Sequence, residues 1–233
     1  QKLAEDAAKK AGKFLNKNKK NKKNILYEAG RDIKLEVDIS TEEIIRKELS
    51  KSRIDVMGEE LGGSLSNNLC WVVDPIDGTA NYFRGLDQCC ISIALLKGEQ
   101  ALIGVIYNFN NNELYSAQKS CGAYLNNEKI FVSDIATKSK ACLTTGFPAS
   151  ESIESSVKFL GDLASWKKVR MFGSAALSCA YVASGKCDYY AEKGVYLWDF
   201  AAGICLVQEA GGKVKYDSLE NQRYSVEFSN NLL

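Results

Sequence analysis

Two aspartates three residues apart are the strongest candidates for a functional site in this sequence of 233 residues. Asp74 and Asp77 belong to the hexapeptide at positions 74–79, Asp-Pro-Ile-Asp-Gly-Thr, which follows an apolar run at 71–73. That run predicts a buried strand that delivers Asp74 to the end of a sheet. The short spacing lets both carboxylates converge on one centre, and such oxygen ligands are typical of a site for a hard divalent cation.

The residues after Asp77 add a place for an anion. Gly78 allows the backbone to come close to a ligand, and Thr79 offers a hydroxyl group. If a helix begins here, the amide groups of Gly78, Thr79 and Ala80 can point at a phosphate. The hexapeptide therefore combines a cation site with a phosphate seat.

Two other acidic positions strengthen this interpretation. Glu59 and Glu60 follow a short predicted strand, and Asp199 stands beside Trp198 at a predicted helix start. A D-x-x-D pair alone would favour an ordinary acidic turn, whereas the whole hexapeptide together with these positions favours a functional site. Glu60 is left open between a supporting role and an ordinary surface acid.

The sequence contains no histidine. This excludes Ser-His-Asp catalysis, Cys-His catalysis and zinc sites built on imidazole. Acid–base chemistry must come from carboxylates, hydroxyls, lysine or metal-bound water.

The composition describes a globular chain with no global attraction to a polyanion. The hydrophobic content is 45% and the net charge is +1, so neither nucleic acid nor a membrane surface is favoured as a partner. No apolar run of 18 residues exists, and residues 1–13 have an amphipathic helix pattern rather than that of a secretory signal. The eight cysteines form no C-x-x-C pair, so we expect buried thiols in a reducing cytosol.

Helices and strands must bring these side chains together. Apolar spacing and capping residues predict helices at 4–15, 42–49, 152–165, 174–184 and 198–210, the second starting after Ser40 and Thr41. Short apolar or alternating runs predict strands at 56–57, 71–74, 89–96, 101–107, 113–117, 142–145, 169–172 and 188–191. Helix pairs thus alternate with sheets, without an internal repeat or a flexible linker.

Five motifs occur in order along nearly the whole chain. Gly58–Glu60 reads G-E-E, Trp71–Asn81 reads W-x-x-D-P-I-D-G-T-x-N, and Gly173–Ala176 reads G-S-A-A. Val182–Tyr190 reads V-A-S-G-K-x-D-Y-Y, and Trp198–Gly212 reads W-D-x-A-A-x-x-x-x-x-x-E-A-G-G. With these motifs the sequence resembles the inositol monophosphatase family.

The resemblance implies an α/β fold, a layered α-β-α-β-α sandwich similar to inositol monophosphatase and fructose-bisphosphatase. An N-terminal α+β half, residues 1–140, would carry Glu59 and the 74–79 motif. A C-terminal α/β half, residues 141–233, would carry Glu192 and Asp199. The resemblance also implies a cytoplasmic homodimer.

The resemblance implies a role for each matching residue. Mg²⁺ ligands would be Glu59, Asp74, the Ile76 carbonyl, Asp77 and Asp199. Glu59 and Thr79 would orient the water that attacks phosphorus, and Asp38, four residues before Glu42, would line a third metal position. Substrate contacts would come from the Gly78 and Thr79 amides, the Ala175 backbone and the Glu192 carboxylate.

Two departures leave the number of Mg²⁺ ions open between two and three. Leu35 stands where the family usually has threonine, three residues before Asp38. Tyr27 stands where a lysine often contacts water at the third position, and Lys34 is out of register with it. Arg84 and Lys193 are expected to be solvated charges.

The expected activity is Mg²⁺-dependent, lithium-sensitive hydrolysis of a small phosphorylated polyol, with inositol monophosphate first. The alternatives are 3′-phosphoadenosine-5′-phosphate or fructose-1,6-bisphosphate hydrolysis, and a transcription-associated binding protein with the same fold. Residues 80–82, Ala-Asn-Tyr, resemble the inositol branch more than the nucleotide branch, where lysine often follows the threonine.

Overall fold

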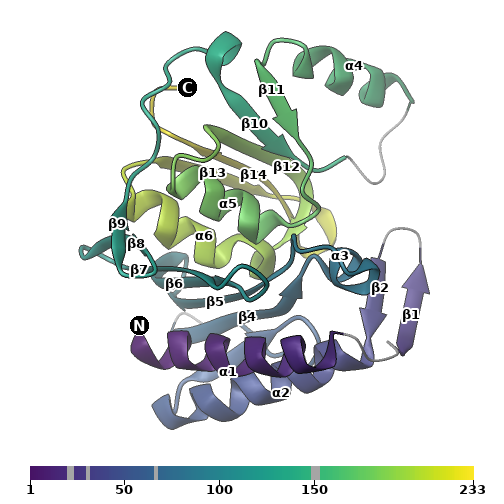
Figure 1. Cartoon of the computed structure of the whole chain (residues 1–233), viewed down its shortest axis with the longest axis vertical. Coiled ribbons are helices and arrows are strands. Elements are labelled where there is room, and N and C mark those ends of the chain that lie inside the picture. The colour runs from purple at the N-terminus through teal and green to yellow at the C-terminus, as the bar shows by residue number, and fades with distance from the viewer. Residues whose placement is uncertain (20–23, 30–31, 66–67, 148–152) are drawn as a thin grey trace.

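The computed structural model describes residues 1–19, 24–29, 32–65, 68–147 and 153–233. Helices and sheets alternate in layers, as Figure 1 shows. Helices α1 (Lys2–Asn18) and α2 (Glu36–Leu49) cover the outer face of a seven-stranded sheet. Helices α5 (Ala175–Ala183) and α6 (Leu197–Glu209) separate it from a five-stranded sheet, and α4 (Ile153–Leu163) lies beyond that sheet. The expected layered fold is confirmed.

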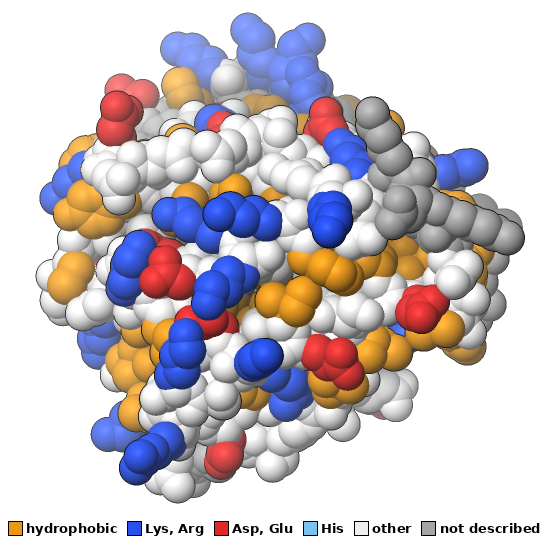
Figure 2. Space-filling view, turned by 60° about the horizontal axis from the view of Figure 1, so that its bottom comes forward, with side chains coloured by type: hydrophobic (Ala, Val, Ile, Leu, Met, Phe, Trp, Pro, Cys, Tyr) orange, Lys and Arg blue, Asp and Glu red, His pale blue; other side chains and the backbone are white. Residues whose placement is uncertain are grey.

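Small side chains bring α1 close to the first sheet. Ala4, Ala8, Ala11 and Leu15 recur at helical spacing, and all four are fully buried. A Cβ atom at Gly12 would lie 2.6 Å from a ring carbon of Tyr107, so a larger residue there would push the helix off the sheet. The face of the molecule on this side mixes lysine and arginine with acidic side chains (Figure 2).

The seven-stranded sheet carries the strands predicted between residues 56 and 117, and one of them is longer than expected. Its order is β3-β4-β5-β6-β7-β8-β9, with β3 and β4 parallel and the rest antiparallel. The strand predicted to end at Asp74 runs on to Asp77, with an irregular register against β5 between these two residues. The bounds are β3 Asp55–Gly58, β4 Leu69–Asp77, β5 Cys90–Lys97, β6 Gln100–Asn108, β7 Glu113–Gln118, β8 Gly122–Leu125 and β9 Glu128–Ile130.

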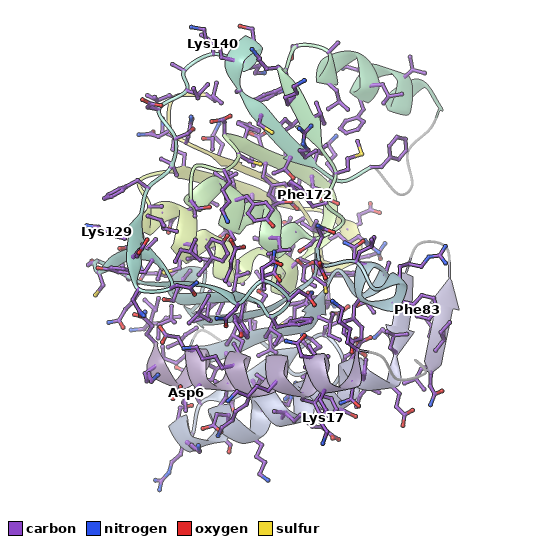
Figure 3. All side chains as sticks on the ribbon, in the orientation of Figure 1. Asp6, Lys17, Phe83, Lys129, Lys140 and Phe172 are labelled. Atoms are coloured by element: carbon purple, nitrogen blue, oxygen red, sulfur yellow. The ribbon has the colours of Figure 1, made fainter. Side chains whose placement is uncertain are left out.

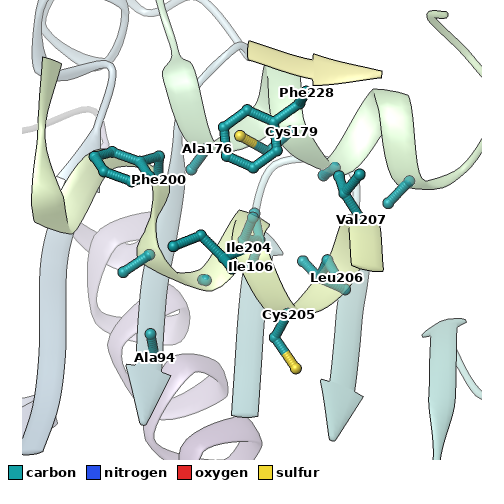
Figure 4. Packing of buried hydrophobic residues seen from close by; sticks show 14 of the residues in the cluster. Ala94, Ile106, Ala176, Cys179, Phe200, Ile204, Cys205, Leu206, Val207 and Phe228 are labelled. Carbon is teal, nitrogen blue, oxygen red and sulfur yellow. The ribbon is translucent and has the colours of Figure 1, made fainter. Parts of the chain in front are cut away.

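Helices α5 and α6 are apolar on nearly every side because a sheet faces them from each direction. Figure 4 shows α6 side chains such as Phe200 and Ile204 packed with Cys179 of α5 and Phe228 of the second sheet. Gly203 lets α6 approach Cys179, since a Cβ atom there would collide with that side chain.

The second sheet has the order β11-β10-β12-β14-β13. Strand β10 pairs in parallel with β11 and β12, whereas β14 pairs antiparallel with β12 and β13. The bounds are β10 Cys142–Thr145, β11 Lys168–Arg170, β12 Tyr189–Tyr196, β13 Lys213–Ser218 and β14 Arg223–Ser229.

Several elements differ from the sequence-based prediction. Helix α2 begins at Glu36, six residues before the predicted start at 42, so Asp38 lies in its first turn. A hairpin of β1 (Ile25–Ala29) and β2 (Asp32–Leu35) precedes it, and α3 (Thr79–Arg84) begins at the last residue of the hexapeptide. Short 3₁₀ turns lie at Ser50–Ser52, Lys138–Lys140 and Glu220–Gln222.

The cysteines are free thiols, and six of the eight are buried. Cys121 is exposed and Cys142 is partly exposed, so burial of all eight was a wrong expectation. Cys121 lies in the tight turn before β8, where the chain reverses at the surface. In the described residues, no helix combines the length and the hydropathy needed to cross a bilayer.

Candidate active site

Asp74 lies in the middle of the candidate site, on β4, with 2% of its surface exposed. One carboxylate oxygen, Oδ1, accepts a hydrogen bond from the Ile76 amide at 2.9 Å. Burial raises the pKa of Asp74 well above its usual range, and the negative charges of Glu59, Asp77 and Asp199 raise it further. The predicted ligand Asp74 is therefore surrounded by the other predicted ligands.

Asp77 connects strand β4 to the start of helix α5. Its carboxylate accepts hydrogen bonds from the Ser174 hydroxyl, the Ala175 amide (3.2 Å) and the Ala176 amide (2.8 Å). These donors belong to the first turn of α5, which Ser174 caps by accepting from the Leu177 amide. Burial raises the pKa of Asp77, while the hydrogen bonds from α5 lower it in part.

Glu59 approaches Asp74 from the turn after β3. Its amide donates to the Val73 carbonyl at 3.2 Å, which ties the turn to β4. Burial raises the pKa of Glu59 to about 8, with further contributions from Glu60 and Asp38. Glu59 and Asp74 are close enough for each side chain to shift the pKa of the other, with that of Glu59 lowered and that of Asp74 raised by the contact.

Asp199 joins this group from the first turn of α6. Its Oδ2 accepts from the Tyr196 amide at 2.8 Å, so the carboxylate is held at the start of the helix. Burial raises the pKa of Asp199 well above its usual range, followed by the charges of Asp77 and Glu59. The structure thus places Glu59, Asp74, Asp77 and Asp199 near one another from three segments: the turn after β3, strand β4 and the start of α6.

The donor chemistry of this group fits a hard cation. Carboxylates that raise one another's pKa in a buried site are stabilised by a positive charge placed among them. Within the described residues, no three acidic side chains already stand at the mutual distances of a finished ligand cage. The residues therefore offer oxygen ligands, and a cation placed among them would stabilise their ionised forms.

The carboxylate of Asp38 is also buried and would also be stabilised by a nearby cation. It is 1% exposed in the first turn of α2, and its Oδ2 accepts from the Leu35 amide at 2.7 Å. Its other oxygen is buried without a partner among the described residues. Burial raises the pKa of Asp38 to about 7.

Lys34 is a residue that sequence reasoning placed out of register. Its ammonium group lies 3.2 Å from a carboxylate oxygen of Glu60, and it lowers the pKa of both Asp38 and Glu59. Glu60 is paired and its side chain is nearly buried, so it is not an ordinary surface acid. The sequence did contain a signal for this role: several acidic residues lie near Lys34 in the chain, and such acids require a positively charged partner. Arg84 and Lys193 are exposed, as expected.

Gly78 and Thr79 form a tight corner between β4 and α3. Gly78 has a left-handed φ of 88°, and a Cβ atom there would lie 2.8 Å from the Gln88 carbonyl oxygen. The Thr79 hydroxyl donates to the Ile76 carbonyl at 2.8 Å. Ile76, a predicted carbonyl ligand, therefore lies next to the hydroxyl of Thr79.

Asn81, the last residue of the first long motif, fastens this corner to the second half. Its side-chain amide donates to the carbonyls of Gln88 and Phe172, both at 2.7 Å. Figure 3 shows Phe172 between the two parts of the molecule, above the first sheet. The side chain of Asn81 thus joins α3 to the segment that precedes α5.

Glu192 and Ala175 border the same region. Ala175 is nearly buried next to Asp77, and the Glu192 carboxylate accepts from the Tyr190 hydroxyl at 3.0 Å. Burial raises the pKa of Glu192 to about 7, and the charge of Asp77 adds to this effect. A cavity of about 380 Å³ lies beside Glu192 and is lined by residues of β10, α4, β12 and β14, including Thr145, Phe159, Lys193 and Glu227.

Comparison with known proteins gives one consistent family. The model of the inositol monophosphatase family matches residues 1–225. A protein of Xylella fastidiosa named Nus factor SuhB is 38% identical over 215 residues, covering 89% of this chain and 78% of the relative. A Synechocystis inositol-1-monophosphatase is 38% identical over 204 residues, covering 82% of this chain and 70% of the relative. The crystal structure of SuhB from Bartonella henselae superposes with a TM-score of 0.92 at 31% identity, covering 99% of this chain and 93% of that one.

Proposed function

Since this chain belongs to the inositol monophosphatase family, we propose that it hydrolyses a small phosphomonoester with Mg²⁺ and that its substrate is inositol monophosphate. The observation that carries the proposal is the proximity of Glu59, Asp74, Asp77 and Asp199: the charges of Glu59 and Asp77 raise the pKa of both Asp74 and Asp199. A phosphatase of this kind needs such a set to hold cations beside a doubly charged ester.

The proposed metal ligands all offer oxygen. Glu59, Asp74 and the Ile76 carbonyl would hold one ion, and Asp74, Asp77 and Asp199 a second. Asp38, with its unpartnered oxygen, would border a third position. When bound, the ions supply Lewis acidity that makes water nucleophilic at neutral pH and stabilises the departing alkoxide. Oxygen ligands without imidazole or thiolate favour Mg²⁺ over zinc.

The chain's own groups would orient the reactants. Because the Thr79 hydroxyl donates its proton to the Ile76 carbonyl, its oxygen can accept a hydrogen bond from the attacking water. The carboxylate of Glu59, close to Asp74, can accept a second hydrogen bond from this water. The amides of Gly78 and Thr79 would hold the phosphate, since the left-handed turn at Gly78 brings the backbone close.

Glu192 and Ala175 would contact the alcohol portion of the substrate. Two observations support this part of the proposal: Glu192 lines the adjacent cavity, and it is close enough to Asp77 for that charge to raise its pKa. A carboxylate that accepts from the substrate's hydroxyl groups favours a polyol over a simple alkyl phosphate. The proposal also includes two or three Mg²⁺ ions, inhibition by lithium, a cytoplasmic location and a homodimer, each of which rests on the family.

Phosphate release tests the proposal. Inositol 1-phosphate, fructose-1,6-bisphosphate and 3′-phosphoadenosine-5′-phosphate are each offered with Mg²⁺, with Mg²⁺ plus lithium, and with EDTA. We expect the highest kcat/KM for inositol 1-phosphate, a loss of activity in EDTA and inhibition by lithium. Full activity in EDTA would end the metal-dependent mechanism, and a preference for either other ester would replace the substrate.

A transcription-associated binding role is the second candidate, because one of the relatives at 38% identity is named a Nus factor. It requires no hydrolysis. A folded protein that binds Mg²⁺ and releases no phosphate from any of the three esters would favour this role over the enzymatic one.

A further inference from the structure

We propose that Glu42, together with Arg46, is a positioning residue for the reaction: the pair fixes the turn at residues 58–62 and thereby holds Glu59 toward the metal centre. The inference deepens the proposed function and rests on it for its effect on catalysis. Its structural part, the fixing of the turn, can be measured without turnover.

Glu42 is a buried acid next to the turn at residues 58–62, and it is not one of the predicted metal ligands. It lies on α2 and is 0% exposed. Its Oε2 accepts from the Glu60 amide at 2.8 Å, and its Oε1 accepts from the Leu61 amide at 3.3 Å. One side chain of the helix therefore binds two successive amides directly after Glu59.

Arg46, one helical turn later, completes the attachment. Its Nε donates to Oε1 of Glu42 at 2.6 Å. Its two other nitrogens donate to the Val56 carbonyl (3.1 Å) and to the Gly62 carbonyl. The guanidinium thus joins Glu42 to β3 on one side and to the far end of the turn on the other.

Gly58 shows that the carboxylate requires this space. A Cβ atom at Gly58 would collide with the carboxylate of Glu42. The first residue of the G-E-E motif is therefore glycine because the Glu42 carboxylate lies against its backbone. The Gly58 amide also donates to the Gly62 carbonyl at 3.0 Å, which closes the turn.

These contacts leave Glu59 little freedom. Its own amide is bound to Val73 of β4, and the next two amides are bound to Glu42. Mutation of a residue that orients a metal ligand through hydrogen bonds typically changes metal affinity or activity about 10–100-fold. A glutamine side chain in place of Glu42 would offer one acceptor and one donor group, and the donor would face an amide N–H or the Arg46 guanidinium.

The experiment compares Glu42→Gln with Glu48→Gln. Glu48 is a buried acid on the same helix, paired with Lys10 and Lys51 and remote from the turn, so its substitution controls for loss of a buried charge. We expect Glu42→Gln to raise the Mg²⁺ concentration for half-maximal activity and to lower kcat, each by about tenfold or more. KM for inositol 1-phosphate should change less than either. Glu48→Gln should leave all three near the wild-type values.

Hydrogen exchange separates a failure of this inference from a failure of the proposed function. In the metal-free protein, the amides of Glu60 and Leu61 should exchange faster in Glu42→Gln than in wild type. In Glu48→Gln their exchange rates should equal those of wild type. If Glu42→Gln does not fold, Arg46→Lys, which keeps the charge and loses the forked contacts, takes its place. Unchanged exchange at these amides, or a Mg²⁺ dependence equal to that of Glu48→Gln, would overturn the inference even if wild type is an active phosphatase. Faster exchange without phosphate release by wild type would leave the turn attachment standing and reject the enzymatic function.

Discussion

The two ends of helix α2 place buried acids in opposite electrostatic surroundings. At its start, Asp38 is 1% exposed, has one unpartnered oxygen among the described residues, and has a pKa raised by burial to about 7. At its end, Glu48 is 7% exposed and lies between Lys10 and Lys51. The hydrogen bonds from these lysines lower the pKa of Glu48.

The difference distinguishes acids that form ion pairs within the chain from acids that lack such a partner in the described part of the chain and would be stabilised by a bound cation. Glu48 and Glu42 have cationic partners within the chain, whereas Asp38, Asp74 and Asp199 have raised pKa values. An uncompensated buried carboxylate destabilises the fold when it ionises, unless a ligand supplies positive charge. The candidate site is therefore expected to gain stability from Mg²⁺, and the far end of α2 is not.

The largest effect is expected at Asp77, which belongs to both categories. Asp77→Asn should lower kcat at least about a hundredfold, equivalent to about 3 kcal/mol of transition-state stabilisation. It should also destabilise the metal-free protein by about 1–3 kcal/mol, because an amide nitrogen would face the donors of Ser174 and α5. Urea unfolding without Mg²⁺, beside phosphate release, measures both.

Ser174→Ala sharpens the same point. It removes one donor to Asp77 and the cap of α5, so it should cost about 1 kcal/mol and leave most of the activity. A metal-free Asp77→Asn protein as stable as wild type would show that the hydrogen bonds of Asp77 to the start of α5 do not stabilise the fold.

A smaller, pH-dependent effect is expected at Glu192. Its pKa in the folded protein is about 7, above the value of 4.5 for an unperturbed glutamate. The stability contributed by the protonated carboxyl is therefore complete below about pH 4.5 and is lost as the pH rises through about 7. Glu192→Gln is neutral throughout, so its melting temperature relative to wild type should rise between pH 5 and pH 8.

Kinetics on the same Glu192 variant test the substrate contact. If the carboxylate binds a hydroxyl of the alcohol equally in the ground and transition states, KM should rise about tenfold with kcat nearly unchanged. An unchanged KM for every ester would place Glu192 outside the substrate site.

The smallest effect is expected at the other end of α2. Glu48→Gln should slightly lower the melting temperature, and the loss should shrink at high salt because its lysine partners are partly exposed. Added Mg²⁺ should raise the melting temperature of this variant as much as that of wild type. A reduced Mg²⁺ effect would mean that the two ends of α2 are not independent.

The sequence predicted strands β3 to β7 of the first sheet because they carry strong local signals, but it did not predict β8 and β9. Apolar strands of ordinary length and a motif at a strand end leave few alternatives. The start of α2 was wrong because Ser40 and Thr41 resemble capping residues, whereas their hydroxyls donate to the carbonyls of Glu36 and Val37 inside the helix. The observed N-cap is Leu35, a residue type with no capping preference.

Two other omissions have different causes. Strand β14 carries Tyr224, Val226 and Phe228 at alternate positions, a signal that was present and could have been used. The position of Lys34 could not be read from its spacing, because the hairpin of β1 and β2 decides which side chains reach Asp38 and Glu60. Long-range placement of this kind depends on tertiary packing rather than on local pattern.

The most direct test of the account is the Mg²⁺-induced change in melting temperature of wild type and Asp74→Asn, recorded together with release of phosphate from inositol 1-phosphate. Wild type should be stabilised by Mg²⁺, by about 2.7 kcal/mol at 100 times the dissociation constant. Asp74→Asn removes a charge that Glu59, Asp77 and Asp199 repel, so the metal-free variant should be at least as stable as wild type, with a reduced Mg²⁺ effect and at least about a hundredfold lower turnover. A destabilised metal-free variant with a normal Mg²⁺ response and normal turnover would mean that Asp74 supports only the turn, and would contradict the proposed site.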